Sequence, residues 1–458
     1  MSRETLAQLD RIFHPRSIAI VGASNTANNF GRWFLKGFVD VGFENLYPVH
    51  PRESEIMGLK VYPSVKQIPG EVDLAILTLP ARTIPKIVAE CADKGVKGVV
   101  VYSAGFGEMG EEGKKLEEEI VRIARKGGTR IIGPNCVGIS SLRFKIALPH
   151  SFSLGSGSVA MISHSGSLTT MSRTAAAMGV RYGKVVSCGN ECDLNMVDFL
   201  EYFGEDPETK IITIYLEGVK DGRRFYELAG RISQTKPIII WKGGMTDFGA
   251  GAAASHTGAL AGSSQVWEAV FKQTGVISVK SAEEMLDCVL AFDRLPLPRG
   301  RRVVVISGMG GPSVGTADAC IEFGLEVAEI SEQSRRRIAR LIPSIGTSIK
   351  NPIDLGMGVL FNPSFYGEAV KILARDGNVD MLLVIGHAAP GYSKVMIEAT
   401  RGLKKALVLT TGGVSAIGTT AEVDEALLGS GIPLYPDARR AAIALAKLAN
   451  YADFLKGA

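Results

Sequence analysis

The chain has 458 residues, of which 46% are hydrophobic and 21% charged, and its formal net charge is only +4. At about 150 residues per domain, this length predicts three domains, each large enough for its own core. The small, dispersed charge argues against nucleic acid as a partner. No apolar run reaches the ~20 residues that span a bilayer.

The first residues lack the apolar segment of a signal peptide, and the six cysteines show neither disulfide nor zinc spacing. We therefore expect reduced thiols, a cytoplasmic location, no membrane association and no metal site in this chain.

A parallel sheet is predicted for the N-terminal part of the chain. Helical patterns, such as residues 111–126, alternate there with short apolar runs. This alternation is typical of a doubly wound α/β fold, and we assign residues 1–140 to a Rossmann-like domain. Its strands are expected at 17–22, 46–49, 73–79, 97–102 and 129–132.

The remainder of the chain contains an internal repeat, with domains expected at 158–292 and 300–458. Three pairs of similar segments occur in the same order in both halves. Each half is therefore predicted to be a flavodoxin-like domain with Gly/Ser-rich turns after its strands. The pairs are VAMISHSGSL (159–168) with VVVISGMGGPSV (303–314), KPIIIWKGG (236–244) with KALVLTTGG (405–413), and GVISVKSAEEMLDCVLAF (275–292) with GIPLYPDARRAAIALAKL (431–448).

The strand tips of the first domain favour a ligand that carries a nucleotide. Gly22, Ala23 and Ser24 follow the first strand, where small residues let backbone N–H groups approach a phosphate. Arg52 follows the second strand and suits the ribose phosphate of coenzyme A (CoA) or NADP. The other tips add candidate ligand-binding residues, namely Pro80, Ser103, Ala104, Gly105 and Asn135. The G-x-G-x-x-G motif of dinucleotide oxidoreductases is absent, which disfavours that class.

A serine-rich turn in the second domain is predicted to bind phosphate. It lies between a strand and a helix, so that amides and helix dipole converge on an anion. Its residues are Ser163, His164, Ser165, Gly166 and Ser167. For His164 we favour a bystander role over direct contact with the phosphate.

His256 lies in the loop GAGAAASHTGALAG (249–262), whose small residues leave the backbone great freedom. When the double glycines of the repeat are aligned, Glu425 stands opposite His256, so the scaffold folds without a histidine there. This indicates chemistry rather than packing, although a surface histidine in a turn is the simpler alternative. Glu217 ends the apolar run 211–216, where a carboxylate can fix an imidazole tautomer; the simpler alternative is a surface acid.

The ordered motifs GAS, YPVHP, TLPA, SAGF, GPNC, ISHSGSL, YLEGVKDGR and ASHTGALAG resemble the NDP-forming acyl-CoA synthetases. The likeness covers essentially the whole chain and is strongest to α subunits of ADP-forming acetyl-CoA synthetases, relatives of succinyl-CoA synthetase. It implies a CoA-binding domain, two ligase domains and an ATP-grasp β subunit in an α₂β₂ heterotetramer. It also implies that His256 is phosphorylated, that Glu217 orients it, and that the serine-rich turn holds the phosphoryl group.

The implied reaction converts acyl-CoA, phosphate and ADP to a carboxylic acid, CoA and ATP through acyl phosphate and phosphohistidine. ADP/ATP and Mg²⁺ would bind on the partner. A non-catalytic CoA-binding paralogue and, less favoured, an NADP-dependent oxidoreductase are the alternatives. The family commonly has small residues where Glu191 and Cys192 stand, so the identity of the acyl group is left open. The preference for ADP or GDP is also left open, because that pocket would lie on the partner subunit. We expect loss of the His164 side chain to matter far less than loss of His256 or Glu217.

Overall fold

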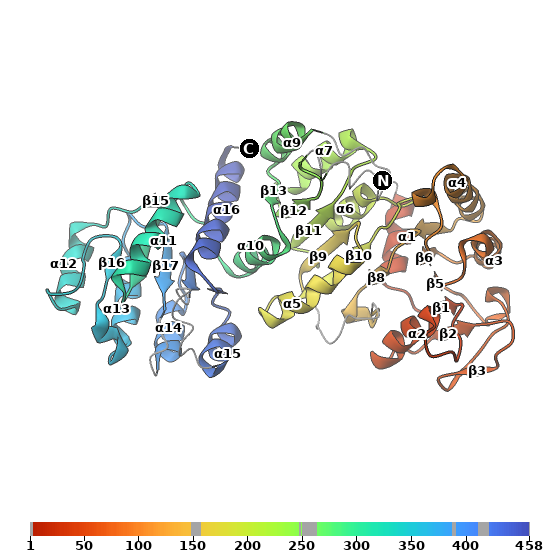
Figure 1. Cartoon of the computed structure of the whole chain (residues 1–458), viewed down its shortest axis with the longest axis horizontal. Coiled ribbons are helices and arrows are strands. Elements are labelled where there is room, and N and C mark those ends of the chain that lie inside the picture. The colour runs from red at the N-terminus through yellow and green to blue at the C-terminus, as the bar shows by residue number, and fades with distance from the viewer. Residues whose placement is uncertain are drawn as a thin grey trace. The chain divides into compact units, whose positions relative to one another are not determined.

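The computed structural model describes residues 3–147, 157–246, 249, 263–386, 391–410 and 421–457. The chain divides into two compact units. The first comprises Met1–Ala177 and Arg181–Val279, and the second comprises Met178–Val180 and Lys280–Ala458. Largely parallel β-sheets, flanked by helices, form the centre of both units (Figure 1).

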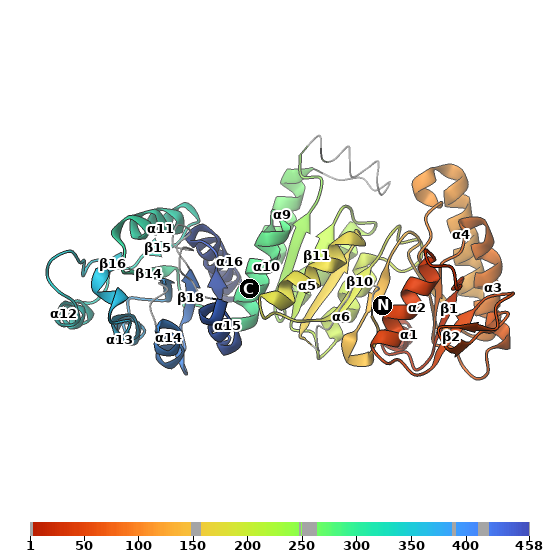
Figure 2. The same cartoon turned by 60° about the horizontal axis from the view of Figure 1, so that its bottom comes forward.

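The first sheet of the first unit has the order β2-β1-β5-β6-β7, and every pairing in it is parallel. Most of its strand residues are buried because helices cover both faces, which explains the continuous apolar runs in the sequence. Helices α3 and α4 lie side by side (Figure 2). The strands are β1 (Ile18–Val21), β2 (Leu46–Val49), β5 (Leu74–Leu77), β6 (Gly98–Val101) and β7 (Arg130–Ile132), and a small hairpin pairs β3 (Glu55–Ile56) with β4 (Leu59–Lys60); the helices are α1 (Arg3–Phe13), α2 (Phe30–Asp40), α3 (Ile84–Lys94) and α4 (Glu111–Lys126).

The second sheet has the order β13-β12-β11-β9-β10-β8. Only β8 is antiparallel, along the edge of β10, so residues 138–140, which we expected at the end of the first domain, extend the second sheet. The strands are β8 (Gly138–Ser140), β9 (Val159–Ser163), β10 (Tyr182–Ser187), β11 (Ile211–Leu216), β12 (Ile238–Lys242) and β13 (Ile277–Val279); the helices are α5 (Met171–Ala177), α6 (Met196–Glu205), α7 (Gly222–Ile232) and α9 (Ser264–Thr274).

One hydrophobic core joins these two sheets. Phe13 at the end of α1 packs against Phe199, Tyr202 and Phe203 of α6, with ring centroids 6.3, 5.1 and 5.4 Å away. Buried aromatic side chains contribute large apolar areas and prefer such offset and edge-to-face geometries. The two sheets therefore share one packed core.

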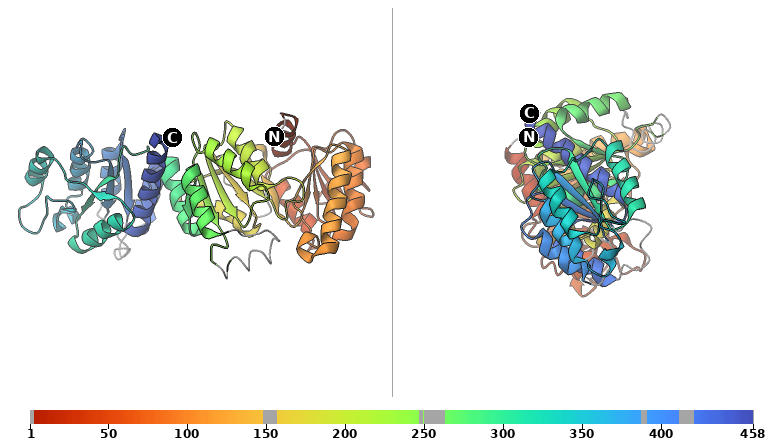
Figure 3. Two further views of the ribbon diagram at one scale, coloured as in Figure 1. Left: turned by 90° about the horizontal axis from the view of Figure 1, so that it is seen from above. Right: turned by 90° about the vertical axis from the view of Figure 1, so that its left-hand side faces the viewer.

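The second unit is built on one sheet of order β15-β14-β17-β18-β19, with β16 paired to β14. Helices lie on both of its faces (Figure 3). The strands are β14 (Arg302–Ser307), β15 (Glu326–Val327), β16 (Ile353–Asp354), β17 (Met381–Ile385), β18 (Ala406–Thr410) and β19 (Leu434–Tyr435); the helices are α10 (Ala282–Arg294), α11 (Gly310–Glu322), α12 (Glu332–Leu341), α13 (Ser364–Leu373), α14 (Tyr392–Thr400), α15 (Ala421–Ser430) and α16 (Ala438–Gly457).

The strand orders confirm the internal repeat. Numbered within each copy, β9–β13 and β14, β15, β17, β18 and β19 both run 2-1-3-4-5, the flavodoxin-like order. In each copy the last strand leads into a helix, α10 or α16, and these two helices pack on each other. Arg440 of α16 pairs with Asp287 of α10 at 2.6 Å. Helix α10, which we expected to close the second domain, therefore packs within the second unit.

The short 3₁₀ helices are η1 (Val65–Gln67), η2 (Ala81–Thr83), η3 (Gly107–Met109), η4 (Leu142–Phe144), η5 (Ser167–Thr170) and η6 (Met357–Leu360). All six cysteines are free thiols. Among the residues that the structure describes, no helix is long and apolar enough to cross a membrane, and no three His, Cys, Asp or Glu side chains cluster as metal ligands would.

Candidate functional site

A cavity of about 670 Å³ lies in the first unit, where strand tips of its two sheets meet. This volume is within the range of small-molecule sites. It brings together residues predicted separately for the nucleotide-bearing ligand and for phosphate. The lining is Phe30, Thr78, Leu79, Pro80, Tyr102, Ser103, Ala104, Asn135, Cys136, Val137, His164, Ser165, Gly166, Gly189 and Asn190. Phe30, Tyr102 and Val137 were not anticipated, because nothing in their local sequence marks them.

The turns after β7 and β10 are bound to each other at this cavity. The backbone N–H of Asn190 donates to Pro134 O at 2.9 Å, and Asn135 Nδ2 donates to Asn190 Oδ1 at 3.5 Å. A Cβ on Gly189 would lie 2.0 Å from Pro134 O, and its φ is +57°, so only glycine permits this approach. The Gly-Asn pair thus joins the two sheets at the site.

Two carboxylates fix the Asn190 side chain. Its Nδ2 donates to Glu117 Oε1 at 2.8 Å and also to Glu108. Glu108 accepts the amide N–H groups of Gly105 and Phe106 as well. Burial alone would raise the pKa of Glu108, but the hydrogen bonds it accepts, chiefly from the Gly105 amide and Asn190, together outweigh burial and lower that pKa. The Gly105 amide, which we proposed for ligand binding, is therefore engaged by an ionised glutamate.

The serine-rich turn follows β9 as predicted and leads into η5 and then α5. The Ser163 hydroxyl donates to Ser165 O at 2.7 Å, and Ser165 and Ser167 share a hydroxyl–hydroxyl contact of 2.9 Å. A Cβ on Gly166 would meet Val137 Cγ2 at 2.3 Å, so this glycine lets the turn approach the segment between β7 and β8. Of the five predicted residues, His164, Ser165 and Gly166 line the cavity, whereas Ser163 is fully buried and Ser167 is exposed outside the lining.

His164 is buried, and both of its ring nitrogens have partners. The backbone N–H of Glu217 donates to Nδ1 at 3.2 Å, and Nε2 lies 3.1 Å from Glu191 Oε1. Burial alone would lower the pKa of His164, but the carboxylates of Glu191 and Glu217 outweigh it and raise that pKa above the ordinary value of 6.5.

Glu191, whose importance we had not anticipated, is itself tightly held. Its Oε1 accepts the backbone N–H of Met196 at 2.6 Å, and Lys220 Nζ donates to its carbonyl at 2.7 Å. Its φ of +56° is left-handed, which costs a non-glycine residue about 1–3 kcal/mol. The surrounding contacts must therefore compensate for the cost of this backbone conformation.

Glu217 lies directly after β11 at the carboxyl edge of the sheet, as predicted, and is 7% exposed. Its Oε1 accepts the Tyr215 hydroxyl at 3.3 Å, and its carbonyl accepts from Lys242 Nζ at 2.9 Å. Burial lowers the pKa of Lys242, and the charge of Glu217 only partly offsets this. The sequence could have indicated this contact, because a lysine that ends a buried apolar strand needs a hydrogen-bond partner.

The first two strand tips do not line this cavity. The Gly22 N–H donates to Val49 O at 3.1 Å, Asn29 Oδ1 accepts the Ser24 N–H at 3.2 Å, and Ala23 is fully buried. Arg52 is exposed after β2. These residues stay candidates for the outer part of a long ligand. His256 lies outside the described residues, between β12 and α9 in the sequence.

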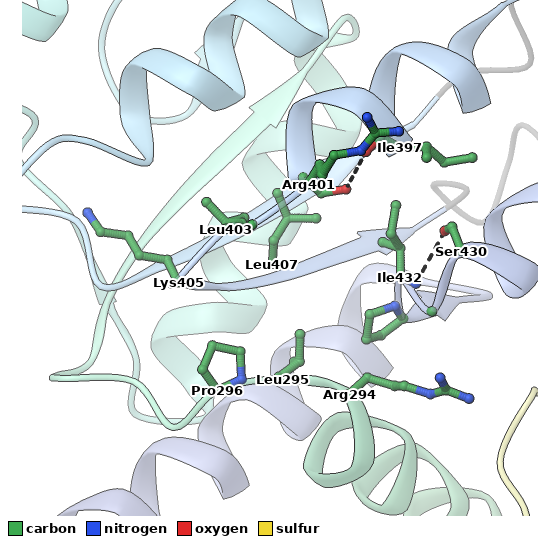
Figure 4. Close-up of a pocket in the computed structure, with 14 residues that line it drawn as sticks. Arg294, Leu295, Pro296, Ile397, Arg401, Leu403, Lys405, Leu407, Ser430 and Ile432 are labelled. Carbon is green, nitrogen blue, oxygen red and sulfur yellow. Dashed lines mark hydrogen bonds between the residues drawn. The ribbon is translucent and has the colours of Figure 1, made fainter.

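A second cavity, of about 350 Å³, lies in the second unit at the amino ends of β18 and β19 (Figure 4). Its wall is mostly apolar, including Leu403, Leu407 and Ile432, with Arg294, Arg401 and Lys405 around it. Ligands of parallel sheets bind at the opposite, carboxyl edge. None of the predicted site residues that the structure describes lines this cavity.

Three family models match consecutive parts of the chain. Residues 16–141 match a CoA binding domain, residues 156–292 a succinyl-CoA ligase like flavodoxin domain, and residues 303–449 a Ligase-CoA domain.

Relatives named as acetate–CoA ligase α subunits match over nearly the whole chain. The chain is 40% identical to the α subunit of an acetate–CoA ligase [ADP-forming] II from Pyrococcus furiosus, covering 96% of this chain and 98% of the relative. Identity to the isoenzyme I α subunit from the same organism is also 40%, over 97% and 98%. A structure described as dinucleotide forming acetyl-coenzyme A synthetase 1 from Ca. Korarchaeum cryptofilum, in complex with phosphate and ADP, superposes with a TM-score of 0.89 at 33% identity, covering 98% of each chain.

Proposed function

Because the chain belongs to the family of ADP-forming acetate–CoA ligase α subunits, we propose that it converts acyl-CoA, phosphate and ADP to a carboxylic acid, CoA and ATP. The observation that carries this proposal is the cavity in the first unit. It joins the strand tips of the CoA-binding part, at Pro80, Ser103 and Asn135, to the serine-rich turn at Ser165 and Gly166. A thioester and a phosphate could therefore meet in one place.

In the first step, a phosphate oxygen attacks the thioester carbonyl, the C–S bond breaks, and CoA leaves as a thiolate that takes up a proton. The product is an acyl phosphate. Amides and hydroxyls of the serine-rich turn suit the developing negative charge, since donors placed where charge develops lower the barrier.

In the second step, a ring nitrogen of His256 attacks the phosphorus of the acyl phosphate, and the carboxylate leaves with the bridging oxygen. Glu217 would accept a hydrogen bond from the other ring nitrogen and keep the attacking one unprotonated. A terminal phosphate oxygen of ADP then attacks the phosphohistidine, the P–N bond breaks, and ATP forms.

The partner in this proposal is an ATP-grasp β subunit, which would hold ADP and Mg²⁺, in an α₂β₂ assembly. The support is that the P. furiosus relatives are named as α subunits. Two transfers at separate sites need a carrier, and the Gly/Ala setting of His256 suits one. Six free thiols fit a reducing compartment, and we propose the cytoplasm.

A reconstitution tests this proposal. Purified alone, the chain is expected to form no ATP from acetyl-CoA, ADP and phosphate, and an ATP-grasp β subunit should restore turnover. ATP would be measured by luminescence, with the β subunit alone as the control. ATP formation by the isolated, contaminant-free chain would contradict the division of labour. If the complete mixture bound CoA but showed neither turnover nor phosphorylation of His256, the non-catalytic paralogue would be favoured.

A second prediction concerns Arg52. Replacing it with alanine should weaken CoA binding by about 1–3 kcal/mol, the range for a charge-assisted hydrogen bond. The reason is that its exposed guanidinium after β2 suits the 3′-phosphate of CoA. Calorimetry with dephospho-CoA is the control, because the wild type should bind this ligand as weakly as the variant binds CoA. Equal wild-type affinity for both ligands would remove Arg52 from this role, and tighter binding of NADPH would favour the oxidoreductase alternative.

A further inference from the structure

The His164 ring connects the serine-rich turn to Glu217 and Glu191. The ring lines the cavity beside Ser165 and Gly166, and only 8% of the residue is exposed. Its Nδ1 receives the backbone N–H of Glu217, and its Nε2 faces Glu191 Oε1. The ring therefore links the wall of the cavity to the main chain of Glu217.

These partners select one form of the ring. An N–H cannot donate to a nitrogen that already carries a proton, so the Glu217 contact requires a lone pair on Nδ1. The proton of the neutral ring is then on Nε2, where it can be donated to Glu191. Protonation of Nδ1 would set two N–H groups against each other and break the contact with Glu217.

Glu217 is held from two sides by neighbouring strand tips. Its N–H is bound by His164, at the end of β9, and its carbonyl is bound by Lys242, at the end of β12. Strands β9 and β12 both pair with β11, which carries Glu217. Its main chain is therefore placed by side chains and not only by the sheet.

We propose that His164 is a positioning residue, which in its neutral form, with Nδ1 accepting the Glu217 N–H and Nε2–H facing Glu191, holds Glu217 in place for phosphoryl transfer. This rests on the proposed function, in which Glu217 orients His256. Loss of a proton from Nδ1 engages Glu217, and gain of that proton releases it. Phosphoryl transfer is expected to fall as His164 becomes protonated.

The direction of the pH dependence follows from the groups around the ring. The carboxylates of Glu191, from the segment before α6, and Glu217, after β11, favour the imidazolium. Burial, Lys220 from the segment before α7, and the Glu217 N–H that donates to Nδ1 oppose it. Because the pKa of His164 is raised overall, the protonated form persists to higher pH than for an ordinary histidine. The acid limb of activity should therefore lie at higher pH than it would for a histidine of ordinary pKa.

The Glu191→Gln substitution tests this coupling. Glutamine keeps an oxygen that can accept from His164 and from the Met196 amide, but it removes the charge that favours the imidazolium. The acid limb of phosphohistidine formation from acetyl-CoA and labelled phosphate should move down by about one pH unit or more. A uniform loss at every pH, with no shift, would overturn the proposal.

Two further variants separate the two nitrogens. His164→Asn retains an acceptor at the position of Nδ1 and cannot ionise, so it should lose the acid limb that arises from His164. His164→Gln instead places its amide near the position of Nε2 and leaves no acceptor for Glu217, so it should be at least tenfold slower than His164→Asn at high pH. Equal rates in two variants with matching thermal unfolding would contradict the role of Nδ1.

Nuclear magnetic resonance of ¹⁵N-histidine gives a readout without turnover. The His164 signal, identified by its loss in His164→Asn, should show the Nε2–H tautomer at high pH and titrate at lower pH in Glu191→Gln. An Nδ1–H tautomer would overturn the proposal. If the wild type shows no phosphoryl transfer even with the β subunit, the proposed function fails, whereas the resonances still decide the ring's role.

Discussion

Replacing His256 with alanine is expected to abolish both the phosphoryl adduct and turnover with the β subunit. The loop 249–262 contains no other side chain able to form a phosphoramidate, and its small residues suit a carrier between two sites. The wild type, incubated with acetyl-CoA and labelled phosphate, should show an acid-labile, base-stable adduct, located on His256 by mass spectrometry. The fold should persist, because the repeat has Glu425 at the corresponding position.

His387→Ala is the matched control for this experiment. It removes the same side chain from a position for which the sequence shows no catalytic constellation, so its adduct and turnover should match the wild type. Phosphate found on His164, or full turnover in His256→Ala, would show that the carrier is misassigned.

Glu217→Gln is expected to slow phosphorylation of His256 sharply, by up to ~10⁴-fold, as removal of an orienting carboxylate can in a catalytic triad. The substitution keeps the size of the side chain and its place after β11, but it removes the negative charge. The imidazole would then lose the partner that sets its tautomer and stabilises positive charge during attack. Rapid-quench measurement of adduct formation would determine the rate.

Glu227→Gln controls for the loss of a surface carboxylate in the same region. Glu227 is on α7, its side chain is 57% exposed, and it pairs with Arg223. Exposed ion pairs contribute little to stability, so this variant should phosphorylate at close to the wild-type rate. A Glu217→Gln rate within tenfold of the wild type would remove the orienting role.

Much of the fold could be predicted from local patterns. The amphipathic segment 111–126 forms α4 with those bounds, and the apolar run 211–216 forms β11. These predictions succeeded because a buried parallel strand is apolar throughout, whereas a surface helix has an apolar stripe. The internal repeat could also be predicted from local sequence, because both copies place Gly/Ser-rich turns after corresponding apolar strands.

The partners within the site could not be predicted in this way. A strand tip places Glu217 at the carboxyl edge of the sheet, but no pattern in the sequence shows that its N–H faces His164 or that Glu191 faces the same ring. At the first strand tip, a composition that suggested ligand binding was instead used for contacts within the protein. Gly22 and Ser24 have the composition of a phosphate-binding turn, yet Val49 and Asn29 engage their amides.

The sequence by itself determined the three sheets, the repeat, the family and the residues on which the proposed chemistry rests, because periodicity and turn composition are local properties. The tertiary structure decided which of these residues meet. It joined the first two sheets through one core, added β8 to the second sheet, packed α10 against α16, and placed His164 between Glu191 and Glu217. Such contacts depend on side-chain directions across segments far apart in the chain, which pack only when the whole core forms.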